Sequence, residues 1–190
     1  MVLEKKECEH AAVVLAQTRQ ALIARDPIKL KELSDMTLHS SCCYQDDGSI
    51  TAAVLIYTLS KLIERQDDKK IPDWDNFIKK FNSILDITIV ELQKHNHKIY
   101  GEHMQKARNL LENISPQHTA YIKEVIRKAT INKAQKIHDH GISLGKTAQL
   151  LGISSWELVQ FTAQKTSFDP NLENTYEIKK RAKMALEFFG

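Results

Sequence analysis

Residues 143–161 read SLGKTAQLLGISSWELVQF, which encodes two short helices with a tight turn between them. Ser143 can cap the first helix, because a serine hydroxyl accepts a hydrogen bond from a backbone N–H of the first helical turn. Ser154 can cap the second helix in the same way. Ala148 is small where the helices must approach closely, and Gly152 falls where the turn needs a positive φ. The spacing of caps and glycine therefore predicts a helical hairpin.

The apolar positions of this stretch fit a helix-turn-helix of the DNA-binding kind. Ile153 would fill the space between the two helices, and Leu158 and Phe161 would face inward. We therefore predict a helix-turn-helix at residues 143–163. The alternative is an ordinary helical hairpin that packs on the rest of the protein and does not touch DNA, because hairpins of this length are common.

The outer face of the second helix, which includes Val159, supplies side chains that could contact DNA. Serine and glutamine can donate to and accept from base edges in the major groove, whereas lysine and threonine could bind backbone phosphates. The predicted DNA-binding residues are Lys146, Thr147, Ser154, Ser155, Trp156, Gln160 and Lys165. The tryptophan is also typical of packing or of a protein interface. Each lysine alone could be a solvated surface charge.

The distribution of charge agrees with a C-terminal end that faces nucleic acid. The 190 residues carry a net charge of +3. Residues 120–190 hold 11 Lys/Arg and 7 Asp/Glu, whereas the rest of the chain holds 16 and 17. The positive excess thus lies in the C-terminal third, where phosphates would attract it. A chance fluctuation in composition is the alternative explanation.

Helical signals occupy most of the remaining sequence. Gly and Pro are scarce, at 6 and 4 residues, which suits long helices joined by short connections. Asp26-Pro27 and Ser115-Pro116 each resemble a helix cap followed by a first-turn proline, and Gly141 resembles a helix stop. Further helices are expected over residues 4–25, 27–43, 50–65, 73–97 (continuing to 111 with a break near Gly101) and 115–140.

The predicted fold class is therefore all-α, with two regions. We expect an N-terminal helical bundle at residues 1–114, to which the sequence assigns no function. A C-terminal region at residues 115–190 would hold the helix-turn-helix and a basic helix at residues 175–189. No run of about 18 apolar residues occurs, so we expect no membrane contact. The three cysteines lack zinc-site spacing, which favours a reduced, cytoplasmic protein.

Residues 141–158, GISLGKTAQLLGISSWEL, resemble the helix-turn-helix of small prokaryotic antitoxins and regulators that accompany PIN-domain ribonucleases. The tail KKRAKMALEFF at residues 179–189 also looks like the short basic helix that ends some archaeal relatives. The resemblance implies a transcription regulator that binds double-stranded operator DNA as a homodimer. It also implies that a PIN-domain ribonuclease toxin is a partner.

Two other functions stay open. One is a helical protein-interaction module without DNA binding. The other is an HD-type metal-dependent phosphohydrolase, suggested by His138-Asp139 and the following His140. Histidines in a last helical turn are also favoured by the helix dipole. The sequence holds no glycine-rich phosphate loop, no Gly-x-Ser-x-Gly and no paired-cysteine zinc site, so we expect no enzyme, no cofactor and no metal.

Overall fold

The computed structural model describes residues 2–44, 47–96, 98–139 and 141–166, and all regular structure within these ranges is helical. The all-α class is thereby confirmed. In chain order the elements are α1 (Val2–Ile23), α2 (Pro27–Tyr44), α3 (Asp47–Glu64), the 3-10 turn η1 (Asp67–Lys69), α4 (Trp74–Gln93), α5 (Lys98–Glu112), α6 (Thr119–Asp139), α7 (Leu144–Leu151) and α8 (Ser155–Thr166). Among the described residues, no helix is long and apolar enough to cross a bilayer.

The predicted start of α2 is confirmed, whereas the predicted start of α6 is wrong by four residues. The Asp26 carboxylate accepts hydrogen bonds from the backbone N–H groups of Ile28 (3.0 Å) and Lys29 (2.9 Å), as an N-cap does. After Ser115, by contrast, the chain makes a separate turn. The Ser115 carbonyl oxygen accepts from the His118 N–H at 3.0 Å, and α6 begins one residue later.

The break that we expected near Gly101 lies earlier in the chain, between α4 and α5. α4 ends at Gln93, and the break follows at His95, whose φ is 61°. Gly101 instead lies inside α5, where it faces Gly48 of α3. A Cβ atom added at Gly48 would lie 3.0 Å from the Gly101 backbone nitrogen and 3.0 Å from the Tyr100 ring. These glycines therefore let α3 and α5 approach closely.

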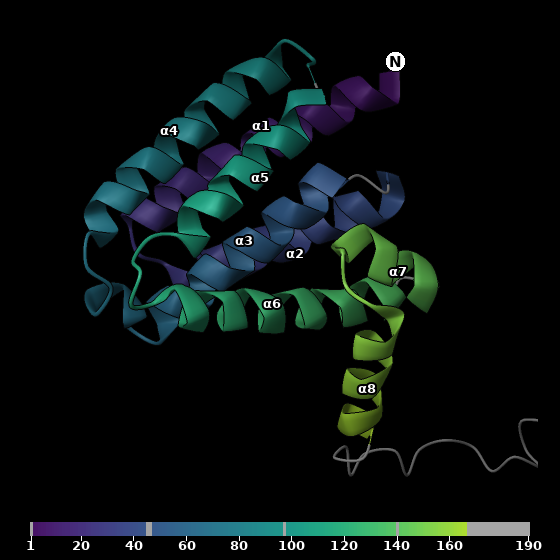
Figure 1. The fold of residues 1–190 in the computed structure, drawn as a ribbon. Helices are drawn as coiled ribbons and strands as arrows, with labels where there is room; N and C mark the ends of the chain where they lie inside the picture. The colour runs from purple at the N-terminus through teal and green to yellow at the C-terminus, as the bar shows by residue number, and fades with distance from the viewer. Residues whose placement is uncertain (1, 45–46, 97, 140, 167–190) are drawn as a thin grey trace, which may run out of the picture.

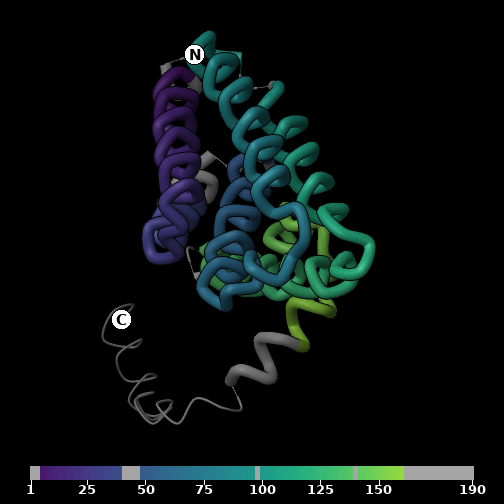
Figure 2. The backbone as a smooth tube through the Cα atoms, turned by 90° about the vertical axis from the view of Figure 1, so that its left-hand side faces the viewer, coloured from purple at the N-terminus to yellow at the C-terminus, as the bar shows by residue number. Residues whose placement is uncertain are grey.

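The helices form a bundle with α3 at its centre. α2 and α3 pack as a hairpin, α1 packs on α2 and α4, and α5 packs on α3 and α4. Figure 2 shows α1 on one side of the bundle and α5 on the other, with α3 between them. The core is apolar, with fully buried side chains that include Leu15, Leu30, Leu33, Leu55, Leu59, Phe81 and Tyr100.

α6 joins this bundle instead of starting a separate unit. It crosses one end of the bundle, below α2 and α3 in Figure 1, and contacts α2, α3 and α5. Its buried Ile122, Ile126 and Ile137 extend the same core. The packing therefore shows no gap at residue 114, where we expected the division between the two regions. α7 contacts both α3 and α6, whereas α8 projects away from the bundle (Figure 1).

Candidate functional site

The turn between α7 and α8 has the geometry that its glycine predicted. Gly152 has a φ of 64°, in the left-handed region. Its N–H donates to the Gln149 carbonyl oxygen (3.2 Å), and the Ile153 N–H donates to the Ala148 carbonyl oxygen (3.1 Å). This pair of bonds is the Schellman arrangement, which satisfies carbonyl groups at a helix C-terminus. Gly152 therefore ends α7 and sets the direction of the chain toward α8.

Both helices of the hairpin are capped by the expected serines. The Ser143 hydroxyl oxygen accepts a hydrogen bond from the Lys146 N–H (3.3 Å), at the start of α7. The Ser154 hydroxyl oxygen accepts from the Glu157 N–H (3.1 Å), at the start of α8. Each cap satisfies a backbone donor that has no partner within its own helix.

The inner side of the hairpin is packed, as its apolar pattern predicted. Ala148 and Leu151 of α7 and Leu158 of α8 are buried. Ile153 is partly buried and packs against the same core. The side chain of Phe161, which was expected to face inward too, lies outside the described residues.

An ion pair holds α8 against α6. The Arg127 guanidinium donates to the Glu157 carboxylate (2.8 Å) and to the Glu124 carboxylate (3.0 Å). These bonds to Glu124 and Glu157 raise the pKa of Arg127. No local sequence pattern predicts this pair, because Arg127 and Glu157 are 30 positions apart.

The outer side of α8 faces solvent. The side chains of Ser155, Trp156, Val159 and Gln160 lie one turn apart in two pairs, so they share one helix face. Trp156 is 69% exposed and Val159 is 40% exposed. The exposed members of the predicted DNA-binding set are Lys146, Ser154, Ser155, Trp156 and Gln160. The structure thus brings five of the seven residues to the surface of the hairpin.

The other two residues of the predicted set are Thr147 and Lys165. Thr147 is fully buried, and its hydroxyl donates to the Ile142 carbonyl oxygen at 3.5 Å. A buried hydroxyl cannot reach a backbone phosphate, so the prediction that Thr147 binds DNA is wrong. Lys165 belongs to α8, but its side chain lies outside the described residues. The expected basic helix at residues 175–189 lies outside them as well.

The His138-Asp139 pair lies at the end of α6. The His138 ring nitrogen Nδ1 lies 3.0 Å from the Ile142 carbonyl oxygen, so this imidazole forms a hydrogen bond to the connection that leads to α7. The side chains of Asp139 and His140 lie outside the described residues. Among the side chains that are described, no group of three or more His, Cys, Asp and Glu could hold a metal ion.

Comparison with known proteins gives no match for this chain. No family model matches the chain, and neither a curated protein nor a solved structure matches it. Any proposal of function therefore starts from the residues of the α7–α8 hairpin and from their surroundings.

Proposed function

We propose that this chain is a DNA-binding transcription regulator in which α7 and α8 act as a helix-turn-helix. The observation that carries the proposal is the two-sided character of α8. Its Leu158 is buried against the hairpin, whereas Ser155, Trp156 and Gln160 face solvent on a helix that projects from the bundle (Figure 1). A projecting helix with polar groups on its outer face can enter the major groove of a duplex.

The exposed side chains divide into two roles. Gln160 and Ser155 would bind base edges, because an amide and a hydroxyl can both donate and accept hydrogen bonds there. Lys146, at the start of α7, would bind a backbone phosphate, and Lys165 of α8 is proposed for the same role. Trp156 would stack on a sugar or contact a thymine methyl group. The Ser154 hydroxyl accepts the capping bond from Glu157 and can still donate its own proton to a phosphate.

The resemblance to antitoxins extends the proposal to partners. A homodimer would place two copies of α8 in successive major grooves, about 34 Å apart along the duplex. A PIN-domain ribonuclease would be the toxin that the helical bundle or the C-terminal tail neutralises. Both partners are proposals that follow from the resemblance of residues 141–158 and 179–189.

A protein-interaction module is the second candidate, and one observation favours it. Trp156 and Val159 expose apolar surface side by side on α8. Aromatic side chains of this kind often anchor protein interfaces. The two candidates differ in salt dependence, because DNA binding releases counterions from phosphates.

The test is fluorescence anisotropy of the full chain with a labelled duplex from its own promoter region, at about 50 mM and about 200 mM salt. We expect binding whose affinity falls steeply as the salt concentration rises. Gln160→Ala should cost about 1–3 kcal/mol on the specific duplex and much less on a scrambled one. Lys146→Ala should weaken binding to both duplexes equally and reduce the salt slope.

Lys106→Ala is the matched control, since Lys106 is an exposed lysine on α5, away from the hairpin. It should leave both affinities unchanged. Absence of duplex binding at the lower salt concentration would refute the proposal. Equal, sequence-independent losses in Gln160→Ala and Lys146→Ala would show that α8 is not the reading helix.

A further inference from the structure

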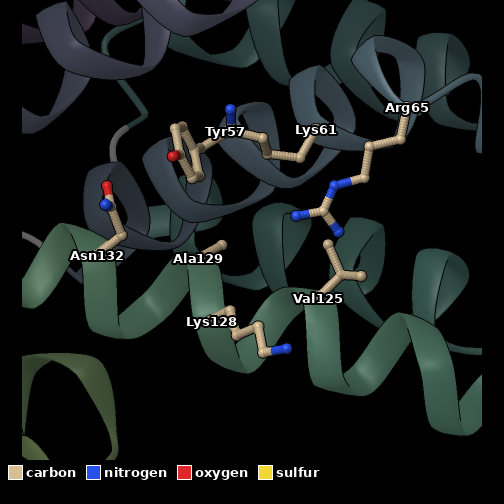
Figure 3. Close-up of a pocket in the computed structure, with 7 residues that line it drawn as sticks. All are labelled: Tyr57, Lys61, Arg65, Val125, Lys128, Ala129 and Asn132. Carbon is tan, nitrogen blue, oxygen red and sulfur yellow. The ribbon is translucent and has the colours of Figure 1, made fainter. Parts of the chain in front are cut away.

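A cavity of about 260 Å³ lies between α3 and α6, on the bundle and not on the α7–α8 hairpin. Its lining residues are Tyr57, Lys61, Arg65, Val125, Lys128, Ala129 and Asn132 (Figure 3). Among the residues that the structure describes, three cationic side chains and no carboxylate line this cavity. The cavity therefore has the electrostatic character of an anion site.

Two of the three cationic side chains lie at one end of the cavity, whereas Lys61 reaches toward Tyr57 at the other end. Figure 3 shows the Arg65 guanidinium reaching from α3 toward α6, with Lys128 of α6 on the same end. Tyr57 and Asn132 lie toward the opposite end. Arg65 also neighbours the Tyr121 hydroxyl, which donates to the Asp67 carboxylate at 2.5 Å. Arg65 of α3 and Lys128 of α6 thus lie on one part of the cavity.

Carboxylates near the cavity pair with its lysines from within the same helices. Glu64 accepts from Lys61 (2.5 Å), and Glu124 lies 3.4 Å from Lys128. Glu124 also accepts from Arg127 at 3.0 Å, so Lys128 shares its acidic partner with a second cation. Lys128 can therefore turn toward an anion while Glu124 keeps Arg127.

Positive charge also lies at the Tyr57 wall of the cavity, where lining Lys61 and buried Lys133 both approach the ring. The Lys133 ammonium nitrogen is 4.4 Å from the centroid of the Tyr57 ring, and the Lys61 nitrogen is 5.5 Å from it. Lys133 is fully buried, and its Asp35 partner is also bound by Lys136. Two cations near one ring make this wall electropositive.

Two buried apolar side chains, Val125 and Ala129, line the cavity between its two ends. They exclude water from one side of a bound molecule, and a lower local dielectric strengthens the attraction between an anion and the cations. A guanidinium matches two phosphate oxygens at once, whereas an ammonium acts as a point charge. The volume is slightly smaller than the roughly 300–1,000 Å³ of sites for drug-sized ligands.

We propose that this cavity binds a small phosphorylated molecule. Its phosphate group lies between Arg65 and Lys128, and its remaining part lies over Val125 and Ala129, toward Tyr57 and Asn132. A sugar phosphate or a nucleoside monophosphate has the right size and charge. The site does not depend on DNA binding by α7 and α8, so its test is independent of the proposed function.

The experiment is isothermal titration of the full chain with inorganic phosphate, ribose 5-phosphate and AMP, at ionic strength held constant with sodium chloride. Adenosine serves as the ligand without a phosphate group. We expect saturable binding of the two phosphate esters, weaker binding of inorganic phosphate and none of adenosine. Arg65→Gln and Lys128→Gln should each weaken ester binding about tenfold, the usual effect of losing one charged hydrogen bond.

Lys80→Gln is the matched control, because Lys80 is an exposed lysine on α4, outside the cavity. It should bind the esters as the unchanged chain does. Arg65 and Lys128 are exposed too, so their variants should fold, and circular dichroism checks this.

Two results would overturn the proposal. The first is no saturable binding of either ester. The second is an equal loss in Lys80→Gln, which would indicate general ionic attraction. With the first result, a loss of duplex affinity in Arg65→Gln and Lys128→Gln would identify a different ligand. That result would assign these two cations to a nucleic-acid backbone instead.

Discussion

The ion pair between α2 and α6 allows a prediction whose size follows from the structure. The Lys133 ammonium is fully buried and donates to the Asp35 carboxylate at 2.7 Å, and Lys136 donates to the other oxygen of that carboxylate at 2.7 Å. Burial lowers the pKa of Lys133 to about 8, against an ordinary value of 10.5. The difference means that folding disfavours the charged form of Lys133 by about 3 kcal/mol, even with its partner in place.

Removing Asp35 and removing Lys133 should therefore change the free energy of unfolding by different amounts at pH 7. Asp35→Asn leaves the buried Lys133 ammonium without its carboxylate, which should lower the free energy of unfolding by about 3–5 kcal/mol. Lys133→Met removes the buried charge and keeps a long, unbranched side chain, while Asp35 keeps Lys136. We expect this variant to be within about 1 kcal/mol of the unchanged chain, or more stable.

The same residue gives the stability a pH dependence of known sign. Between pH 8 and pH 10.5 the unfolded chain binds more protons at Lys133 than the folded chain does. The free energy of unfolding should therefore rise with pH in this range. Burial raises the pKa of Tyr121, as does its bond to Asp67, which acts in the opposite direction above pH 10. The useful range is thus pH 8 to 10.

Urea unfolding followed by far-ultraviolet circular dichroism at pH 7, 8, 9 and 10 measures these effects. The rise with pH should be present in the unchanged chain and smaller in Lys133→Met. Two results would contradict the reasoning: a loss in Lys133→Met as large as that in Asp35→Asn, or the same pH slope with and without the lysine.

Two further predictions concern glycines. Gly48→Ala should lower the free energy of unfolding by about 1–3 kcal/mol, because its Cβ would lie 3.0 Å from the Gly101 nitrogen. Gly101→Ala should have a smaller effect, because its Cβ would lie 3.9 Å from the Gly48 Cα. Thermal unfolding of both variants checks this, and equal melting temperatures would contradict it. Gly152→Val should cost about 1–3 kcal/mol, because its φ of 64° strains a branched residue. In contrast, Gly145→Ala, inside α7, should stabilise the chain by about 0.5–1 kcal/mol. A melting temperature unchanged by Gly152→Val would mean that the turn does not depend on this conformation.

The parts of the fold that local rules control could be predicted from the sequence. The caps at Asp26, Ser143 and Ser154 and the turn at Gly152 each depend on residues within five positions of one another. Thr147 was predicted on the outer side of its helix, although its spacing indicates the inner side. It lies three and four positions from Leu144 and Leu151, so the helical period places it on the inner side.

The parts that depend on distant residues could not be predicted. The α3–α6 cavity joins Arg65 to Lys128, which no local pattern connects. Lys133 occupies an inward position of α6, four residues before the buried Ile137, but the sequence does not show that Asp35 of α2 will meet it. Partners of this kind are set by how the helices pack, which propensity and periodicity leave open.

The two-sided use of α6 has a consequence for how the protein unfolds. One side of this helix completes the bundle core through Ile122 and Ile126, and Arg127 on another side holds α8 through Glu157. Loss of α6 from the bundle therefore removes the support of the hairpin as well. A fragment that begins at residue 115 would expose the buried apolar side of α6 to water. Exchange of the hairpin between proteins during evolution would have to carry α6 together with the surfaces of α2 and α3 that it covers.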